Sequence, residues 1–578
     1  MLASPYYPSM SNPDRAASEA LLAAIRAGVI GDDAAVNGPF GVRRVTYADY
    51  TASGRSLAFI EDYLREAVLP LYANTHTESS GTGLQTSRFR EEARRIIRDS
   101  VGGSKAHHAV IFCGSGSTAA INRLVDILNL RIPNDLDDRY HLREQIPETE
   151  RPVVFIGPYE HHSNELPWRE SIADVVVIHE DQNGRIDQGH LAKELNRYAA
   201  RPLKIGSFSA ASNVTGIVSD VDAISRLLHG QGALSFWDYA AAAPYVPIVM
   251  DPPGDPLAAK DAIFISPHKF IGGPGTPGIL VARRDLFRNR VPAVPGGGTV
   301  MYVNTAEHVY LSDPEHREEG GTPAIVESIR AGLVFQLKEA VGTDLIRERE
   351  HDFIRRAMAR WGANPNVQIL GSPDAERLSI VSFVVRRGSR YLHHNFVVAL
   401  LNDLFGIQSR GGCSCAGPYG HRLLGIDVET SHEFEREIAR GCEGIKPGWV
   451  RVNFNYFISE WVFQYILDAV DLVARDGWKL LPLYEFDPAN GLWRHLDGQP
   501  EPPLSLDAID YSAGRMAWEP RRHRAPEASL VAYLEEAREL MSGSPVPPPP
   551  PESYSVGPDF ETLRWFLLPS EVTGVSGF

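Results

Sequence analysis

One lysine of this chain stands among unusually small residues. Lys269 lies in the stretch SPHKFIGGPGTPG (266–278), and a short apolar segment, 279–282, follows at once. Glycine and proline leave open space around the lysine, so that a flat ligand can approach it closely. An amine in such a place is suited to forming an imine with an aldehyde such as pyridoxal phosphate. Taken alone, the stretch fits a solvated lysine in a Gly/Pro loop equally well.

Five other polar features each follow an expected strand. In chain order they are GSGSTAAIN (114–122), EHHSNELPW (160–168), SAASNVTG (209–216), WDYAA (237–241), and the pair Ser266 and His268. Open α/β sheets bind ligands at this edge. Glycines and hydroxyls that open a helix form an anion site from backbone amides and the helix dipole. Asp238, in the fourth feature, is costly to bury unless it is paired, and a protonated pyridine nitrogen is a suitable partner.

Each feature also has an ordinary structural explanation. The first segment could be a capped helix, His161 a loop residue that holds a turn, and Asn213 one of the many asparagines that precede turns. In the alternative interpretation, His161 stacks on an aromatic cofactor and moves protons, while Asn213 bonds a ring substituent. The occurrence of all five features in order on one chain favours a shared site.

The elements that must position these residues alternate between strand and helix. Short apolar runs fall at 109–112, 153–156, 175–178, 205–208, 234–237 and 262–265, with helical segments between them. Strands that are buried on both faces and alternate with helices predict a mainly parallel sheet in an α/β layer fold. A helical region at 325–361, strands at 378–385 and 449–454, and helices near 391–404 and 459–475 predict a smaller α+β domain.

We therefore expect four regions along the chain. They are an N-terminal arm at 1–40, a large cofactor-binding domain at 41–325, a small domain at 326–475 and an extension at 476–578. The arm contains an expected amphipathic helix at 15–30. The extension is rich in proline at 499–503 and 545–551 and has one expected helix at 526–541, so we expect it to be draped on the surface or partly disordered.

Composition excludes several classes of protein. The 578 residues are 43% hydrophobic and carry a net charge of −16. This negative charge, and the lack of a basic stripe with interleaved aromatic residues, argue against a nucleic-acid partner. No apolar run approaches the ~18 residues of a membrane span, and the first residues lack a signal-peptide pattern. Four cysteines favour a reduced, cytoplasmic protein over a disulfide scaffold. Cys413 and Cys415 have no second Cys or His pair at zinc-site spacing, so we expect no metal.

The ordered motifs SGST, EHHSN, SNVTG, WDYA and SPHKFIGG resemble the class V branch of pyridoxal-phosphate enzymes, especially cysteine desulfurases and selenocysteine lyases. The resemblance covers about residues 40–475. It implies the aspartate-aminotransferase-like fold (fold type I) with a seven-stranded type of sheet, and pyridoxal 5'-phosphate as cofactor. It makes Lys269 the Schiff-base lysine and His161 the residue stacked on the ring. Asp238 then pairs with the pyridine nitrogen and Asn213 lies near the ring hydroxyl or the substrate. The implied phosphate ligands are Ser117, Thr118, Ser266 and His268.

The resemblance also implies a homodimer. The family supplies a threonine from the neighbouring subunit to the phosphate, and Thr322 in EGGTP (319–323) matches it.

In the small domain, RGGCSCA (410–416) resembles the desulfurase loop, in which an arginine is followed five residues later by the cysteine that accepts sulfur. Arg410 plus five is Cys415, and a thiolate there would attack the substrate sulfur. Arg451 matches the family's arginine for the substrate carboxylate. We expect Cys413, if the loop is extended, to lie on the side opposite Cys415. Cysteines that merely pack are the alternative.

Two departures from the desulfurase pattern stand out. Ala241 occupies a position where desulfurases usually carry a glutamine that bonds the ring hydroxyl, and the segment 422–448 is longer than usual.

The leading hypothesis is a lyase that removes sulfur from L-cysteine, leaving L-alanine and a persulfide on Cys415, with a sulfur-acceptor protein as a possible partner. The alternative is a class V aminotransferase, or another pyridoxal-phosphate C–S or C–C lyase, that acts on a different amino acid. A third hypothesis is a scaffold that binds partners through the Pro-rich tail, but Lys269, Asp238 and His161 would be of no use to it.

Overall fold

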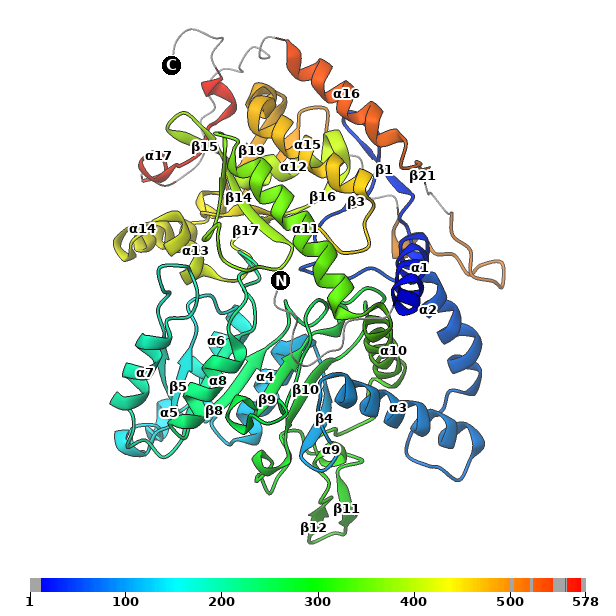
Figure 1. Ribbon diagram of the computed structural model, residues 1–578, viewed down its shortest axis with the longest axis vertical. Coiled ribbons are helices and arrows are strands. Elements are labelled where there is room, and N and C mark those ends of the chain that lie inside the picture. The colour runs from blue at the N-terminus through cyan, green and yellow to red at the C-terminus, as the bar shows by residue number, and fades with distance from the viewer. Residues whose placement is uncertain (1–11, 499–503, 520–522, 544–556, 558, 573–578) are drawn as a thin grey trace. The chain divides into compact units, whose positions relative to one another are not determined.

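The computed structural model describes residues 12–498, 504–519, 523–543, 557 and 559–572 (Figure 1). The chain divides into two compact units. Unit 1 contains residues 1–30, 50–351 and 374–378, and unit 2 contains residues 31–49, 352–373 and 379–578.

Unit 1 is built on a seven-stranded sheet with the order β4-β10-β9-β8-β7-β5-β6. Its strands are β4 (His108–Cys113), β5 (Val153–Ile156), β6 (Asp174–Val177), β7 (Lys204–Ser209), β8 (Leu234–Asp238), β9 (Ala262–Ile265) and β10 (Gly278–Arg283). Only β10 among them runs antiparallel to its neighbours, β4 and β9. The prediction of a mainly parallel α/β sheet is therefore confirmed.

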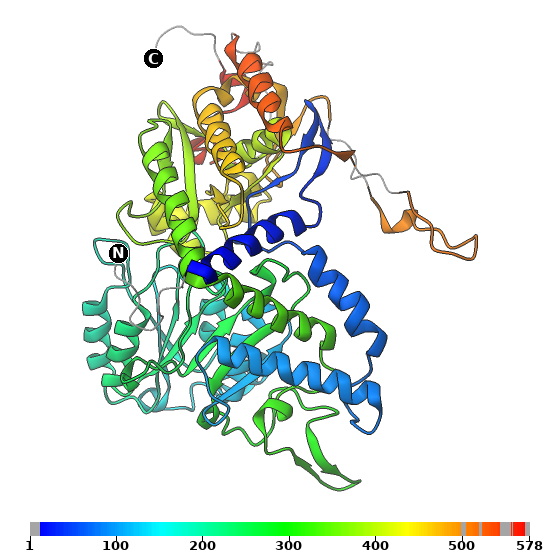
Figure 2. The same cartoon turned by 45° about the vertical axis from the view of Figure 1, so that its right-hand side comes forward.

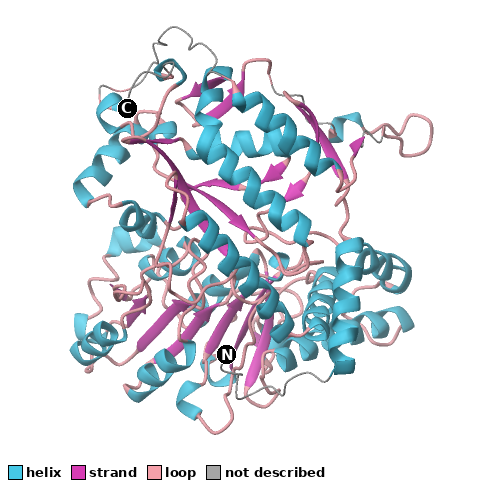
Figure 3. Cartoon of the chain, turned by 45° about the horizontal axis from the view of Figure 1, so that its top comes forward, coloured by secondary structure: helices cyan, strands magenta, loops and turns pink. Residues whose placement is uncertain are grey.

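Helices cover both faces of this sheet (Figure 3). Because side chains alternate along a strand, Ile111, Phe236 and Leu280 face one layer, where they pack with Ile121 and Trp168 of helices α4 (Gly116–Ile127) and α6 (His162–Arg169). On the other face α8 (Val221–Gly230) lies against the sheet, and Trp237 Nε1 donates to Ser225 Oγ over 3.1 Å. This is the three-layer arrangement expected for buried parallel strands.

The other elements of unit 1 surround this core. They are α1 (Asn12–Gly28), α2 (Ala58–Tyr63), α3 (Gly81–Ser100), α5 (Asn134–Tyr140), α7 (Gln188–Arg197), β11 (Val300–Val303), β12 (His308–Tyr310), α9 (Pro314–Arg317) and α10 (Ile325–Val341). The hairpin β11–β12 projects from the unit in both views of the ribbon (Figure 2). The helical region expected at 325–361 is divided at Gly342, and α11 (Thr343–Gly362) follows it across the boundary between the two units.

Unit 2 has an antiparallel sheet with the order β13-β14-β18-β17, with β15 paired to β14. These strands are β13 (Val367–Ile369), β14 (Ile380–Arg387), β15 (Arg390–Leu392), β17 (Arg410–Gly412) and β18 (Trp449–Asn453). Helices α12 (His394–Phe405) and α15 (Glu460–Asp476) pack against each other beside it, and Tyr465 Oη donates to Phe405 O over 2.7 Å. The segment 422–448 contains the end of α13 (Gly417–Leu424) and the whole of α14 (Val428–Ala439).

Both ends of the chain contribute elements to unit 2. From the N-terminal side come β1 (Ala34–Gly38), β2 (Gly41–Arg44) and β3 (Thr46–Tyr47), and β3 pairs with β16 (Ile407–Gln408). From the C-terminal side come β19 (Tyr484–Asp487), β20 (Leu492–His495), β21 (His523–Arg524), α16 (Ser529–Ser542) and α17 (Phe560–Leu563). The helix expected at 526–541 is thus present as α16. The proline-rich stretches at 499–503 and 545–551 lie outside the described residues.

The two units place some residues differently from the four expected regions. The arm expected at 1–40 is shared between the units, α10 belongs to unit 1, and the described part of the expected extension belongs to unit 2. Among the described residues, no helix has the length and apolar character needed to cross a membrane.

Candidate active site

The turn between β4 and α4 packs closely against the turn after β9. Gly116 has φ 57°, and a Cβ on it would lie 2.9 Å from Ser266 Oγ. Ser117 N donates to the same hydroxyl over 2.8 Å. A Cβ on Gly278 would lie only 1.9 Å from Gly116 O, so that position also admits only glycine. The structure therefore brings Ser117, Ser266 and the start of α4 together at the carboxyl edge of the sheet.

Lys269 ends a single helical turn, Pro267–Lys269, directly after β9. Gly54 fixes this turn: its N donates to His268 O over 2.8 Å, and a Cβ on it would collide with Phe270 O. The lysine side chain is half-buried. Burial, together with the nearby Lys269 charge, lowers the pKa of His268 to about 4, so that its ring is neutral at neutral pH.

Asp238 is a buried carboxylate at the end of β8, with 4% of its surface exposed. Burial raises its pKa, while the Ala240 amide, the Lys269 charge and the Ser117 side chain act in the opposite direction. Ala240 N donates to Asp238 Oδ1 over 2.8 Å. Ala241, also buried, lies in the turn that follows. A carboxylate so removed from water is stabilised by a cation placed against it.

His161 caps the N-terminus of α6. Its Nδ1 accepts a hydrogen bond from Ser163 N over 3.1 Å, which leaves the proton of the neutral ring on Nε2. Ser163 Oγ lies 3.0 Å from the same nitrogen and 2.6 Å from Thr118 Oγ1. Hydrogen bonds thus link the imidazole, whose orientation they fix, to the first turn of α4. Asn213 lies in the buried turn after β7.

The sequence analysis missed one buried carboxyl of this site, Glu160. It accepts hydrogen bonds from Ser209 N at 2.8 Å, Ser209 Oγ at 2.6 Å, Asn164 Nδ2 at 2.6 Å and Gly157 N at 3.2 Å. Burial raises the pKa of Glu160 to about 7, against the hydrogen bonds from Ser209 and Asn164 and with a smaller contribution from the Asp238 charge. Its position, directly after an apolar strand and before His161, was the available signal.

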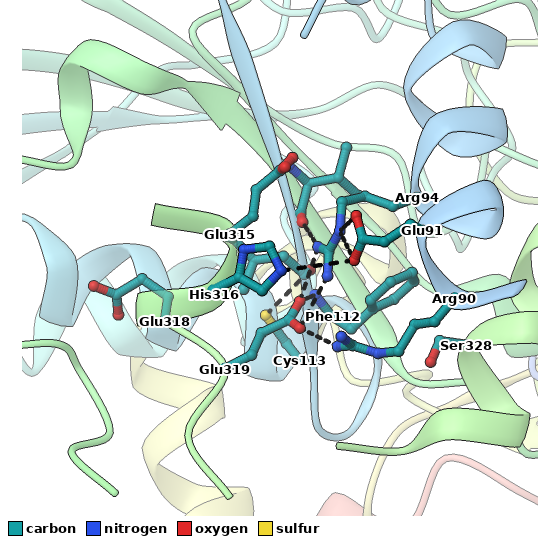
Figure 4. Close-up of polar contacts among 12 residues, drawn as sticks. Arg90, Glu91, Arg94, Phe112, Cys113, Glu315, His316, Glu318, Glu319 and Ser328 are labelled. Atoms are coloured by element: carbon teal, nitrogen blue, oxygen red, sulfur yellow. Dashed lines mark hydrogen bonds and ion pairs between the residues drawn. The ribbon is translucent and has the colours of Figure 1, made fainter. Parts of the chain in front are cut away.

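The segment that carries Thr322 is fixed by a buried ionic cluster (Figure 4). Glu319 accepts from Phe112 N over 2.6 Å and pairs with Arg90 and Arg94 of α3. Burial alone would raise the pKa of Glu319, but the Arg94 and Arg90 charges outweigh it and lower the pKa. The spacing of arginines four residues apart on α3 signals one charged helix face, which the sequence analysis did not use.

Thr322 itself is exposed. Its Oγ1 accepts from Asn74 Nδ2 over 3.2 Å, and Gly321 N donates to Gly297 O over 2.8 Å in the segment that leads into β11.

In unit 2, Arg410 and Cys415 are neighbours. Arg410 lies on β17, and its Nη2 is 3.8 Å from Cys415 Sγ. Ser414 and Cys415 have φ of 52° and 56°, and Ala416 N donates to Cys413 O over 3.1 Å. Two successive non-glycine residues in the left-handed region are unusual and strained.

The conditional expectation of an extended loop, with Cys413 opposite Cys415, is therefore wrong. Residues two apart along an extended strand lie on the same face, so strand geometry does not support that placement. The chain in any case turns at Ser414 and Cys415 and is not extended there. Both thiols are half-buried, which leaves each accessible in part.

Arg451 lies on β18 opposite Arg410 in the strand register, and 1% of its surface is exposed. Its Nη2 donates to Asp49 Oδ1 over 2.7 Å. Burial lowers the pKa of Arg451, although the Asp49 charge opposes this. A carboxylate partner is thus already present beside the guanidinium.

The family model for class V aminotransferases matches residues 46–431, more than half of the chain. The chain belongs to this family. Probable cysteine desulfurases of Streptomyces coelicolor and Halalkalibacterium halodurans are each 27% identical to it, over 68% and 65% of this chain and 88% and 84% of their own. The solved cysteine desulfurase of Thermococcus onnurineus superposes with a TM-score of 0.62 at 22% identity, covering 78% of this chain and 97% of that one. The fold is therefore fold type I, and the enzyme depends on pyridoxal phosphate.

The residues of unit 1 fit this cofactor. Asp238 is a buried carboxylate suited to a protonated pyridine nitrogen, and Gly116 leaves a space beside Ser266 and His268 that a Cβ would fill. We propose that Lys269 binds the aldehyde, that His161 covers the ring face and that Ser117, Thr118, Ser266 and His268 bind the phosphate, with Asn213 near the ring or the substrate.

We predict that borohydride reduction of the protein loaded with pyridoxal phosphate will fix the cofactor on Lys269. Mass spectrometry of the peptide that contains 266–278 checks this, and Lys269→Ala should leave no fixed cofactor. The buried Lys260, which forms an ion pair with Asp222 at 2.5 Å, is an internal control. Label on Lys260 instead would contradict the assignment.

A second prediction concerns Glu160. Because its pKa is raised from 4.5 to about 7, the folded protein binds more protons than the unfolded chain between these values. The stability due to this group is therefore lost as the pH rises through 7. Relative to Glu160→Gln, the wild-type protein should lose thermal stability between pH 5 and 8. The control Glu170→Gln changes an exposed carboxyl at the C-terminal end of α6, the helix that follows Glu160. Its stability should follow the wild-type profile. Parallel profiles for all three proteins would refute the prediction.

Proposed function

We propose that this enzyme is a cysteine desulfurase, which converts L-cysteine to L-alanine and leaves the sulfur as a persulfide on Cys415. The observation that carries the proposal is the half-buried Cys415 thiol on a strained turn, with Arg410 Nη2 3.8 Å from its sulfur. The relatives named as probable cysteine desulfurases support it.

The residues of unit 1 prepare the amino acid. Pyridoxal phosphate, when bound, supplies an electron sink conjugated to the substrate's α carbon. Asp238 would keep the pyridine nitrogen protonated and so maintain that sink. Lys269 Nζ would carry a proton to or from the substrate carbons. His161 would cover the ring and exclude water from it.

Cys415 then accepts the sulfur. Its thiolate attacks the substrate sulfur, and an S–S bond forms as the Cβ–S bond of the substrate breaks. The electron pair of the broken bond stays with the carbon skeleton, which gains protons and leaves as alanine. No external oxidant is consumed. The persulfide is discharged to an acceptor thiol, for which we propose a sulfur-acceptor protein. We also propose Arg451 for the substrate carboxylate, which suits its planar fork. Because the guanidinium is buried and bonded to Asp49, the substrate carboxylate would have to share or displace that partner.

The two cysteines of the turn provide a matched pair of variants. Cys415→Ala should stop alanine and sulfide formation from L-cysteine, because the attacking sulfur is gone, while the spectral change of the cofactor on adding L-cysteine persists. Cys413→Ala should keep most of the activity, since Cys413 does not contact Arg410 in the hydrogen bonds described. Alanine production is measured with and without a reductant.

A wild-type rate of desulfuration in Cys415→Ala would remove the proposed route. The aminotransferase or other C–S or C–C lyase would then replace it, and an assay of other amino acids would identify the substrate.

We further propose a homodimer in which Thr322 reaches the phosphate site of the partner subunit. Thr322 is exposed. It lies between Glu319, which is anchored to Phe112 N, and the start of α10 at Ile325. The adjoining hairpin β11–β12 exposes Met301, Tyr302 and Val303, which is typical of a protein–protein contact.

Mixed dimers test this arrangement. A Lys269→Ala chain and a Thr322→Ala chain are each expected to give homodimers of low activity. When the two are co-expressed with different tags, one site of each mixed dimer contains an intact Lys269 and the other chain's intact Thr322. We therefore expect activity to return in the doubly tagged fraction. An active monomer in sedimentation, or mixed dimers no more active than the parents, would contradict the proposal.

A further inference from the structure

Three nearly parallel rings lie at the start of α12. The His393 and His394 rings are 4.3 Å apart at 27°, and Trp565, from the C-terminal part of the chain, lies 5.8 Å from His394 at 7° and 5.3 Å from His393 at 20°. Burial lowers the pKa of His394 to about 3 and that of His393 well below its usual range, so that both rings are neutral. The stack is therefore an aromatic packing unit without charge.

Trp565 is anchored on both sides. Its Nε1 donates to Ile445 O over 3.1 Å, and its carbonyl accepts from Tyr391 N over 3.2 Å. The next residue, Phe566, is fully buried and meets the edge of His393 at 4.6 Å. The C-terminal segment is thus an integral part of this stack.

The hairpin β19–β20 reaches the same point. Asn395 Nδ2 donates to Gly491 O in its turn over 2.8 Å, and Trp493 and Phe486 lie 5.9 Å and 5.6 Å from His393. Two separate parts of residues 484–572 therefore converge on three successive residues, 393–395.

Two of these residues, His394 and Asn395, contact the strand that begins the cysteine loop, which we define as residues 410–416. A Cβ on Gly448 would come within 2.8 Å of His394 Cε1, and a Cβ on Gly411 within 2.5 Å of Asn395 Oδ1. Gly411 and Gly412 belong to β17, which begins with Arg410 and leads into Cys413. A Cβ on Gly448 would also lie 2.9 Å from the Cα of Gly412, so that position has no room for a larger residue, and Gly411 is in close contact with both side chains.

We propose that the hairpin β19–β20 and the segment 560–572 are a positioning element for the cysteine loop, residues 410–416. Trp565 packs His394 against Gly411 and Gly448, and this contact fixes β17 and the side chains of Arg410 and Cys415. The inference rests on the proposed function for the meaning of Cys415, but the mechanical coupling it describes does not depend on the reaction. It assigns a role to a part of the chain that lies beyond the family match at 46–431.

The test compares Trp565→Ala with Trp518→Ala in the full-length protein loaded with pyridoxal phosphate. Trp518 belongs to the same C-terminal region but is 58% exposed, so its loss should leave the loop unchanged. In Trp565→Ala, we expect amide hydrogen exchange in peptide 408–416 to rise about tenfold, because the support behind β17 is lost. Trp565→Phe retains a flat ring and should restore most of the protection.

Kinetics provide the second measurement. In Trp565→Ala, kcat for alanine formation should fall about tenfold, because Cys415 is no longer held in one place. KM should change less than about threefold, because Asp49 and the pairing of β18 with β14 still hold Arg451. Fixation of the cofactor on Lys269 by borohydride should be unaffected.

Unchanged exchange at 408–416 in Trp565→Ala would overturn the proposal. So would exchange raised equally over all of unit 2, because the segment would then be a general stabiliser. Should Trp565→Ala fail to fold, Trp565→Leu, which keeps much of the volume without a flat face, is judged by the same two criteria. If Cys415→Ala keeps desulfurating, the proposed function fails while the exchange result still decides the coupling.

Discussion

A carboxylate that folding removes from water loses its hydration, and other polar or charged groups must compensate for that loss. In unit 1 this carboxylate is Asp238. Its backbone is fixed by β8, so the side chain cannot swing out to solvent, and the neighbouring amides and hydroxyls compensate only part of the desolvation. A cation bound beside it would supply the rest. The surrounding features suit a flat molecule that carries both a phosphate and a protonated ring: glycines where backbones touch, the N-terminus of α4 beside Ser266, and a lysine on a short turn.

Much of this site could be predicted from the sequence because its residues belong to short segments with a fixed relation to a strand. An apolar run of four to six residues determines where a strand ends, and the residue just beyond it must lie at the sheet edge. Asp238, Ser266 and Lys269 are all of this kind. Glu160 also follows an apolar strand and could have been noticed in the same way. Its partners Ser209 and Asn164 belong to two other elements, so the sequence around Glu160 does not reveal its burial or its hydrogen bonds.

What escaped prediction depends on contacts distant in sequence. The Glu319 cluster joins residues more than 200 positions apart, and the stack of Trp565 on His394 joins the start of α12 to the C-terminal part of the chain. The turn at Ser414 and Cys415 escaped for another reason: neither residue type favours positive φ, so only the tertiary packing reveals that the loop is not extended.

Strand β18 lies between β14 and β17 and pairs with both, yet it follows the last residue of the family match. Strands β1 and β2, on the other side, precede the first. A recombinant fragment cut at the limits of the family likeness would lack the middle strand of the second sheet and would end inside α14. Sequence likeness and foldable boundaries therefore diverge in this protein, and domain swaps or truncations are best designed from the strand order.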